Sequence, residues 1–352
     1  MSNTTDVEVG SQVDRPTTRQ AGAIGRLWSL GLGRLFRLSP DETRVATRGF
    51  SVDSPQVVQR LEEIGASFAY GYNTAIRSAS LDELVAALQL VPPADSGFAF
   101  EGAAMGLALT DWMTPGRRWF EAFVAGPANH HEYMAWVGLG WSLARLPASP
   151  VGALRRHRSI NKWLALDGYG FHEGYFGWRQ SIARQRRPRS LVGSAARVFD
   201  QGLGRSLWFV FGADPAAVTR AIEAFDPGRH GDLWSGVGLA ATYAGGVDSI
   251  GLAALRAAAG CHTAALGQGV VFAAQARQRA GNSVPHAELA CQVILGLRLP
   301  DAAAIARRYL PSYGDGIESY QQWRSDTQAW CARQLQGPQG PQGPQRPVSA
   351  AT

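Results

Sequence analysis

The chain has 352 residues, of which 45% are hydrophobic, and a formal net charge of +6. This is enough apolar material for a buried core and for two or three domains. The basic residues are arginines apart from Lys162, and they are scattered except for a cluster within residues 184–189. Because nucleic-acid-binding proteins usually carry a denser basic stripe with interleaved aromatic residues, we expect no nucleic-acid partner.

The cysteines and the apolar segments indicate the compartment. Cys261, Cys291 and Cys331 are odd in number, far apart and without C-x-x-C spacing, which favours reduced thiols over disulfides or a zinc site. The first 20 residues lack the basic and apolar regions of a signal peptide. The longest apolar candidate, Tyr133–Leu143, is too short to span a membrane. We therefore expect a cytoplasmic protein without a transmembrane segment.

The two ends of the chain differ from its body. Residues 1–20 are polar and aperiodic, as is typical of a disordered arm. Residues 21–59 form an N-terminal segment and lead-in, and leucines and arginines within 21–38 predict a short amphipathic helix. This helix either docks on the body or lies on a membrane surface, and its glycines weaken it as an independent helix. Residues 337–352 carry three Gly-Pro-Gln triplets, too few for collagen, and predict a flexible tail.

The hydrophobic pattern between the ends is helical. Apolar residues within 81–88 follow the i, i+3, i+4, i+7 spacing of a helix face, and residues 218–225 repeat the pattern. Pro215 suits the start of the second of these helices. Alternating strand patterns are scarce, and the best one, Leu207–Phe211, fits a buried helix equally well. We predict an all-α fold.

Self-similarity predicts an internal duplication. The motif E-x-Y-x-x-W-R occurs at residues 173–179 and again, with the same four residue types, at 318–324. Further matches, at offsets of about 129–145 residues, pair 68–71 with 199–202, 97–102 with 231–236 and 138–140 with 267–269. We predict two tandem copies of one helical unit, residues 60–187 and 190–330, related by a pseudo-two-fold axis.

Standard catalytic and cofactor motifs are missing from the sequence. It contains no H-E-x-x-H zinc motif, no Walker A loop and no G-x-S-x-G elbow. Residues 236–241 match G-x-G-x-x-A, but no apolar strand precedes them and no acid follows about 20 residues later. A helical repeat explains these glycines better, so we expect neither a cofactor nor a metal site.

Two residues are predicted as catalytic. Asp232 precedes a small-residue helix, so it is either the N-cap of that helix or a carboxylate at a pocket mouth near Arg229 or His230. His172 is either a structural histidine or an acid–base group, since histidine titrates near neutral pH. The second copy has no histidine at the equivalent position, which favours a function.

Several further polar residues of the second copy stand among apolar ones. Buried polar groups must be paired, so such residues form internal ion pairs or line a pocket. We predict that they bind substrate, and that together with His172 and Asp232 they converge on a cavity between the two copies. The predicted binding residues are Asp200, Gln201, Arg205, Arg229, Trp234 and Gln268.

Three segments, 170–176, 199–214 and 228–246, resemble a known family. It is the family of domain of unknown function 1702, which accompanies enediyne polyketide synthases in actinobacteria. The resemblance covers about residues 35–330. It implies a component of antibiotic biosynthesis that acts on or binds an elongated apolar polyene or polyyne intermediate. Its partners would be the polyketide synthase or tailoring proteins.

Two other functions are open at this point. The protein can be a non-catalytic scaffold or intermediate-binding protein, or a cofactor-free cyclase of an apolar, terpenoid-like substrate. A site between the two halves suits each of them. The cyclase needs an acid that burial keeps protonated deep in a pocket, whereas the scaffold needs no titratable group. A buried acid in an apolar pocket would therefore distinguish them.

Overall fold

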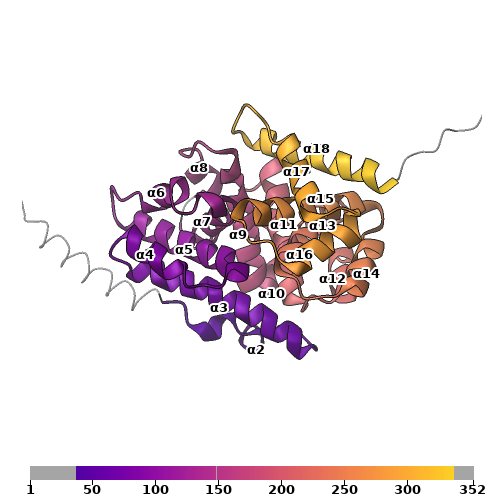
Figure 1. Cartoon of the computed structure of the whole chain (residues 1–352), viewed down its shortest axis with the longest axis horizontal. Helices are drawn as coiled ribbons and strands as arrows, with labels where there is room; N and C mark the ends of the chain where they lie inside the picture. Colours follow the sequence, from indigo (N-terminus) through magenta and orange to yellow (C-terminus); the bar gives the residue numbers. More distant parts are fainter. Residues whose placement is uncertain (1–36, 148, 337–352) are drawn as a thin grey trace, which may run out of the picture.

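The computed structural model describes residues 37–147 and 149–336, and within these ranges the protein contains helices and no strand (Figure 1). The all-α prediction is therefore confirmed. The predicted disordered arm, most of the predicted amphipathic helix and the Gly-Pro-Gln tail lie outside the described residues. No single described helix is long and apolar enough to cross a membrane; only the bent pair Pro285–Leu295 and Leu299–Tyr309, taken together, has the length and composition for it.

Long helices in a row form the core of the described chain. Each packs along the next in sequence, so that the row crosses the molecule from its indigo side to its orange side (Figure 1). These core helices are α3 (Pro55–Arg77), α5 (Pro93–Met113), α7 (Glu132–Leu143), α9 (Leu164–Phe176), α11 (Gly193–Val210), α13 (Pro227–Ala244) and α15 (Thr263–Ala280).

The other helices connect the core helices and cover the ends of the row; all are shorter than the core helices except the last, which has 20 residues. In the first half they are η1 (Pro40–Thr43), α2 (Val45–Arg48), α4 (Leu81–Leu88), α6 (Trp119–Ala125), η2 (Asn129–His131), α8 (Pro150–Leu154), η3 (Ile160–Trp163) and α10 (Trp178–Ser181). In the second half they are α12 (Pro215–Glu223), α14 (Ser249–Ala259), η4 (Gly260–His262), α16 (Pro285–Ala290), the π-helical turn η5 (Cys291–Leu295), α17 (Leu299–Tyr309) and α18 (Ile317–Gln336).

The predicted helix signals in α4 and α12 are confirmed. Pro215 begins α12, and the side chain of Asp214 caps it by accepting from the backbone N–H of Ala216 at 2.8 Å. The apolar positions of both helices face the core, as their spacing requires. Leu207–Phe211 lies at the end of α11, so the helical interpretation of this segment is the correct one.

Neighbouring core helices touch backbone to backbone at glycines. Between α9 and α11, a methyl group at Gly170 would collide with the carbonyl oxygen of Phe199, and one at Gly202 would collide with that of Asp167. The two collisions are reciprocal, so each helix needs a glycine where the other crosses it. Only glycine permits this approach, because every other residue carries a Cβ atom.

The same contact recurs along the row as a Gly-x-Gly pair. Residues i and i+2 of a helix point about 200° apart, so one glycine faces the preceding helix and the other faces the next. In α7, α9, α11 and α13 the first glycine meets the preceding helix and the second meets the following one. These pairs are 138–140, 168–170, 202–204 and 236–238, which recur every 30 to 34 residues.

This shorter period bears on the predicted duplication. The predicted copies are offset by about 129–145 residues, which is about four times the spacing between successive Gly-x-Gly pairs. Gly138 and Gly269 make equivalent contacts with the helix that precedes each of them. A Cβ atom at Gly138 would collide with the backbone of Glu101, and one at Gly269 would collide with that of Ser235. The matched tryptophans have different surroundings: Trp178 is half-buried at the start of α10, whereas Trp323 is buried within α18. The two-copy arrangement and its axis stay a prediction.

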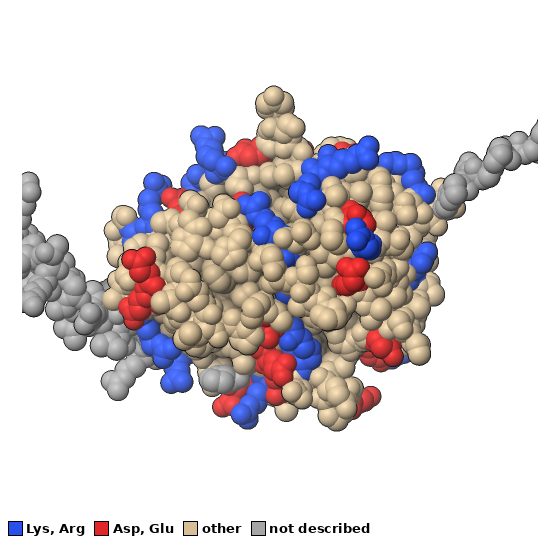
Figure 2. Space-filling view, in the orientation of Figure 1, with Lys and Arg blue, Asp and Glu red and all other residues tan. Residues whose placement is uncertain are grey.

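The row of core helices curls until its ends meet. Arg60 of α3 donates to the carbonyl of Ala244 at the end of α13 at 3.1 Å. Arg277 of α15 donates to the carbonyl of Ala94 in α5 at 2.7 Å. Helix α18 then crosses back over the row and contacts α15, α11 and η3. The inner faces of the core helices therefore surround an interior, while charged side chains of both signs are interspersed on the outer face drawn in Figure 2.

Substitution of one glycine in α13 tests this packing. We expect Gly236→Ala to lower the free energy of unfolding by more than about 3 kcal/mol, because its Cβ would strike the backbone of Gln201 in α11. The matched control is Gly231→Ala in the same helix, where the nearest atom is 3.7 Å away. There alanine should be neutral or stabilise by up to about 1 kcal/mol. Equal effects in chemical denaturation would contradict the close approach of α13 and α11.

Candidate functional site

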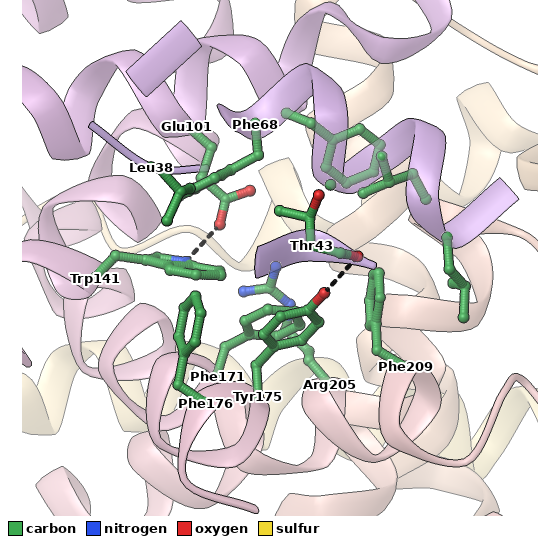
Figure 3. A pocket seen from close by; sticks show the side chains of 14 residues that line it. Leu38, Thr43, Phe68, Glu101, Trp141, Phe171, Tyr175, Phe176, Arg205 and Phe209 are labelled. Carbon is green, nitrogen blue, oxygen red and sulfur yellow. Dashed lines mark hydrogen bonds between the residues drawn. The ribbon is translucent and has the colours of Figure 1, made fainter. Parts of the chain in front are cut away.

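The interior holds a narrow pocket with a cavity volume of about 40 Å³, which we call the aromatic slot (Figure 3). Its walls come from η1, α3, α5, α7, α9 and α11. Aromatic rings form most of the lining, together with aliphatic side chains, and the charged lining residues are Glu101 and Arg205. The rings are those of Phe68, Phe98, Trp141, Phe171, Tyr175, Phe176 and Phe209.

Glu101 places a carboxyl group inside the slot. It lies in the middle of α5, is 3% exposed, and accepts a hydrogen bond at 2.9 Å from the indole N–H of Trp141 (Figure 3). Burial raises the pKa of Glu101 from 4.5 to about 7, although the positive charge of Arg205 and the Trp141 hydrogen bond act to lower it. At neutral pH this carboxyl group therefore exists in both its protonated and its ionised form.

Arg205 and Asp167 form a buried ion pair beside this carboxyl. The guanidinium of Arg205 lies 4.9 Å from the centre of the Phe171 ring and donates to Asp167 Oδ1. Asp167 is fully buried, and its other oxygen accepts from the Gln201 amide at 2.8 Å. The pair thus satisfies both charges internally, as a buried pair must in order to persist.

A second pocket, with a cavity volume of about 30 Å³, lies on the other side of this ion pair. We call it the distal pocket; α7, α9, α11, α13 and α15 supply most of its lining. Arg205 borders both pockets, and Asp167 borders the distal one. The interior therefore consists of two apolar spaces with the Arg205–Asp167 pair between them.

The sequence analysis missed Glu101 and Asp167, although both carry a readable signal. Glu101 is the only charged residue of α5 between Asp95 and Asp111, in a run of small and apolar residues. Asp167 is the only charged residue in the first half of α9, before Gly168. A lone carboxylate in an apolar helix is costly to bury without a partner, so it marks a pair or a functional group.

Asp232 is part of an ion pair across the helices, and its predicted role as an N-cap is wrong. It lies within α13, which Asp226 caps by accepting from Gly228 N–H at 2.9 Å. The oxygens of Asp232 accept from Arg324 at 2.9 Å and from Arg197 at 3.1 Å. Arg324 of α18 is fully buried, so Asp232 neutralises a buried charge and ties α18 to α13.

His172 lies behind the wall of the slot and does not line it. Its Nε2 accepts from Arg145 Nε at 3.4 Å, and its Nδ1 is 3.2 Å from the Glu173 carboxylate. Burial lowers its pKa, and the charge of Arg145 lowers it further, against the opposing effect of Glu173. These contacts fit a neutral imidazole whose Nδ1–H donates to Glu173.

Asp200 and Arg229 pair with each other. Two guanidinium nitrogens of Arg229 donate to the two Asp200 oxygens at 2.6 and 3.0 Å, and Arg187 adds a third contact at 2.9 Å. The internal ion pair predicted for Asp200 therefore exists. Its partner is Arg229 of α13, not the neighbouring Arg205 of its own helix.

The remaining predicted residues lie in the core around these pairs. Ser235 donates to Gln201 at 3.0 Å and lies 2.6 Å from Gln268, so a buried chain of polar side chains runs from α9 to α15. Trp234 is 3% exposed in α13. Of the eight predicted residues, only Arg205 lines the aromatic slot or the distal pocket. The predicted set is thus distributed over separate polar contacts instead of one cavity.

The comparison with known proteins assigns a family. The model of a family described as Protein of unknown function (DUF1702) matches residues 30–331. The chain belongs to the DUF1702 family. No curated protein and no solved structure shows significant similarity to this DUF1702 protein. Among residues 37–147 and 149–336, no group of three or more His, Cys, Asp or Glu side chains is arranged to hold a metal ion.

Replacing Asp232 tests whether it is structural. We expect Asp232→Asn to lower the free energy of unfolding by about 3 kcal/mol, because it leaves the buried guanidinium of Arg324 without a counter-charge. The control is Asp301→Asn, which removes an exposed pair with Arg298 and should cost less than about 0.5 kcal/mol. A fully stable Asp232→Asn protein, measured by urea unfolding, would show that the pair does not support the fold.

The pH dependence of stability tests the buried acid. Because the folded-state pKa of Glu101 is about 7 and its ordinary value is 4.5, only the folded protein holds this proton between these pH values. Stability should therefore fall as pH rises from 4.5 to 7, by about 3 kcal/mol from this group, and then level off. Glu101→Gln removes the titrating carboxyl group, so the pH dependence of stability that this variant retains comes from all other groups. Parallel stability profiles for the two proteins would contradict the raised pKa.

Proposed function

We propose that this DUF1702 protein acts in the biosynthesis of an enediyne-type or related polyketide antibiotic, where it binds an elongated apolar polyene or polyyne intermediate in the aromatic slot. The observation that carries the proposal is Glu101, a carboxyl group with a pKa of about 7 inside a pocket walled by aromatic rings. A polyketide synthase or a tailoring protein in the cytoplasm would supply this intermediate.

The lining of the slot suits a conjugated chain. Flat, unsaturated segments pack favourably against aromatic faces and edges, and the rings of Trp141, Phe171 and Tyr175 lie within 5.1 to 6.3 Å of one another. The aliphatic side chains Leu61 and Ile64 close the wall on α3. An apolar ligand would therefore gain from leaving water, while only the two charged groups of the slot fix its orientation.

In this proposal Glu101 is a proton donor. Its protonated carboxyl transfers H⁺ to one carbon of a double bond, and the electron pair of that bond forms the new C–H bond. The cation left on the other carbon faces aromatic rings, which attract positive charge. Attack by a second double bond, followed by loss of a proton to the Glu101 carboxylate, restores the acid. The net reaction is an isomerisation or cyclisation without an oxidant, a reductant or a co-substrate.

The Arg205–Asp167 pair makes this chemistry compatible with a nearby arginine. An unpaired guanidinium would repel the developing cation and would also hold the pKa of Glu101 low. Asp167, which Arg205 contacts directly, offsets that charge. The pair therefore leaves Glu101 with its raised pKa, so that this carboxyl group is partly protonated at neutral pH.

Two alternatives differ from this proposal, one in its substrate and the other in needing no proton transfer. A terpenoid-like substrate would use the same acid and the same rings, so Glu101 now takes the place that the sequence analysis gave to Asp232. A scaffold or intermediate-binding protein needs the slot but not the proton. A variant that loses the carboxylic acid of Glu101 but keeps its shape and its hydrogen bond distinguishes catalysis from binding alone.

The test is Glu101→Gln in a producing strain that lacks the chromosomal gene. The amide oxygen of the variant can still accept from Trp141, but an amide cannot donate a proton as an acid. We therefore expect product formation to fall at least about 100-fold while a polyene intermediate accumulates. Purified Glu101→Gln protein should bind a fluorescent conjugated polyene as tightly as the wild type does. The control is Glu63→Gln on the exposed face of α3. If the Glu101→Gln strain formed as much product as the wild type, a catalytic role of Glu101 would be excluded and the scaffold function would remain.

A further inference from the structure

A group of arginines surrounds the rim of the aromatic slot. Phe176 marks this rim, because it is half-buried whereas the other aromatic rings of the slot are buried. The guanidinium carbon of Arg48 lies 5.0 Å from the centre of its ring, and that of Arg145 lies 5.4 Å from it. The guanidinium of Arg179 lies close by, against Gly49 at the end of α2.

These arginines lack carboxylate partners. Within residues 37–147 and 149–336, no carboxylate oxygen lies within 4.0 Å of Arg48, Arg145 or Arg179. The Nε atom of Arg48 is buried without a hydrogen-bond partner. Arg145 and Arg179 are exposed and Arg48 is half-buried, whereas the buried Arg205 and Arg324 are each paired with an aspartate and the buried Arg277 donates to backbone carbonyls. Arginines without a carboxylate in contact at the rim of a pocket offer positive charge and hydrogen-bond donors to an anion.

His172 holds one of these arginines in place. Its Nε2 accepts from Arg145 Nε, and a neutral imidazole does this without neutralising the guanidinium. The remaining N–H groups of Arg145 keep their full charge for a ligand. The histidine that the sequence analysis predicted as catalytic is thus a positioning residue for Arg145.

Three carboxylates nearby limit the charge of such a ligand. Glu173 is engaged by His172, Glu62 accepts from the backbone N–H of Val45 at 3.1 Å, and Glu42 lies close enough to raise the pKa of Tyr72. Their negative charges reduce the positive charge that the three arginines present to a ligand. A monoanion is therefore matched by this rim, whereas a diphosphate would add charge that the neighbouring glutamates repel.

We infer that Arg48, Arg145 and Arg179 form a carboxylate-binding subsite, and that the ligand of the slot is an apolar chain with a terminal carboxylate. The carboxylate binds at the rim, with the guanidinium groups donating charge-assisted hydrogen bonds. The chain then passes Phe176 into the slot and reaches Glu101. This inference rests on the proposed function, since it names the chemical class of the chain.

The experiment compares a conjugated C18 tetraene fatty acid with its methyl ester, by the fluorescence of the tetraene on binding. We expect wild-type protein to bind the acid at least about tenfold more tightly than the ester. Arg145→Met and Arg48→Met should each abolish most of this difference while leaving ester binding unchanged. The control is Arg184→Met, an exposed arginine outside the rim. Unchanged melting temperatures confirm that the variants are folded.

The outcomes separate the two proposals. Equal binding of acid and ester by the wild type overturns the carboxylate subsite and leaves the apolar slot in place. Displacement of the tetraene acid by a C15 prenyl diphosphate at lower concentration than by a C15 fatty acid also overturns it. Binding of neither tetraene contradicts the proposed function and, with it, this inference. His172→Leu should weaken acid binding, and His172→Gln, which can still accept from Arg145, should restore it.

Discussion

The close approach of neighbouring core helices is the constraint on which the rest of the structure depends. A glycine on one helix meets a carbonyl oxygen of the next, and the Gly-x-Gly pairs of α7, α9, α11 and α13 place one such contact on each side of the helix. The glycine contacts occupy the two sides of each helix that face its neighbours. The large side chains of the helix must therefore lie on its other faces. In α9 these include Phe171 and Tyr175, which point into the slot.

The interior follows from this arrangement. A curled row of helices with narrow contacts leaves room inside for side chains and for two pockets, and the helices that wall the pockets also supply their few polar groups. Glu101 comes from α5, Arg205 from α11 and Asp167 from α9, so three helices bring together an acid and an ion pair in an apolar space. Burial gives Glu101 its raised pKa, and pairing keeps Arg205 from reversing that effect.

The other buried charges serve the architecture. Asp232 with Arg324 and Asp200 with Arg229 connect helices that are far apart in the chain, and each leaves no charge without a partner. A buried pair favours one arrangement of its helices, because removing either member leaves the other as an unpaired buried charge. The arginines near Phe176 differ from these pairs, because they are half-buried or exposed and have no carboxylate within 4.0 Å, so they and not the core pairs are available to a ligand.

The sequence by itself determined the helical class, the helix start at Pro215, the helix face within residues 81–88, and the need of the polar residues in the second half for partners. These follow from local periodicity, capping and the cost of unpaired polar groups, all of which depend on neighbouring residues. The tertiary structure alone decided which charges meet. Asp200 pairs with Arg229 instead of Arg205, and Asp232 pairs with Arg324, because partners come from other helices whose approach is set by packing. It also decided that Glu101 of α5 is the acid in the slot, since only the assembled helices exclude water from it.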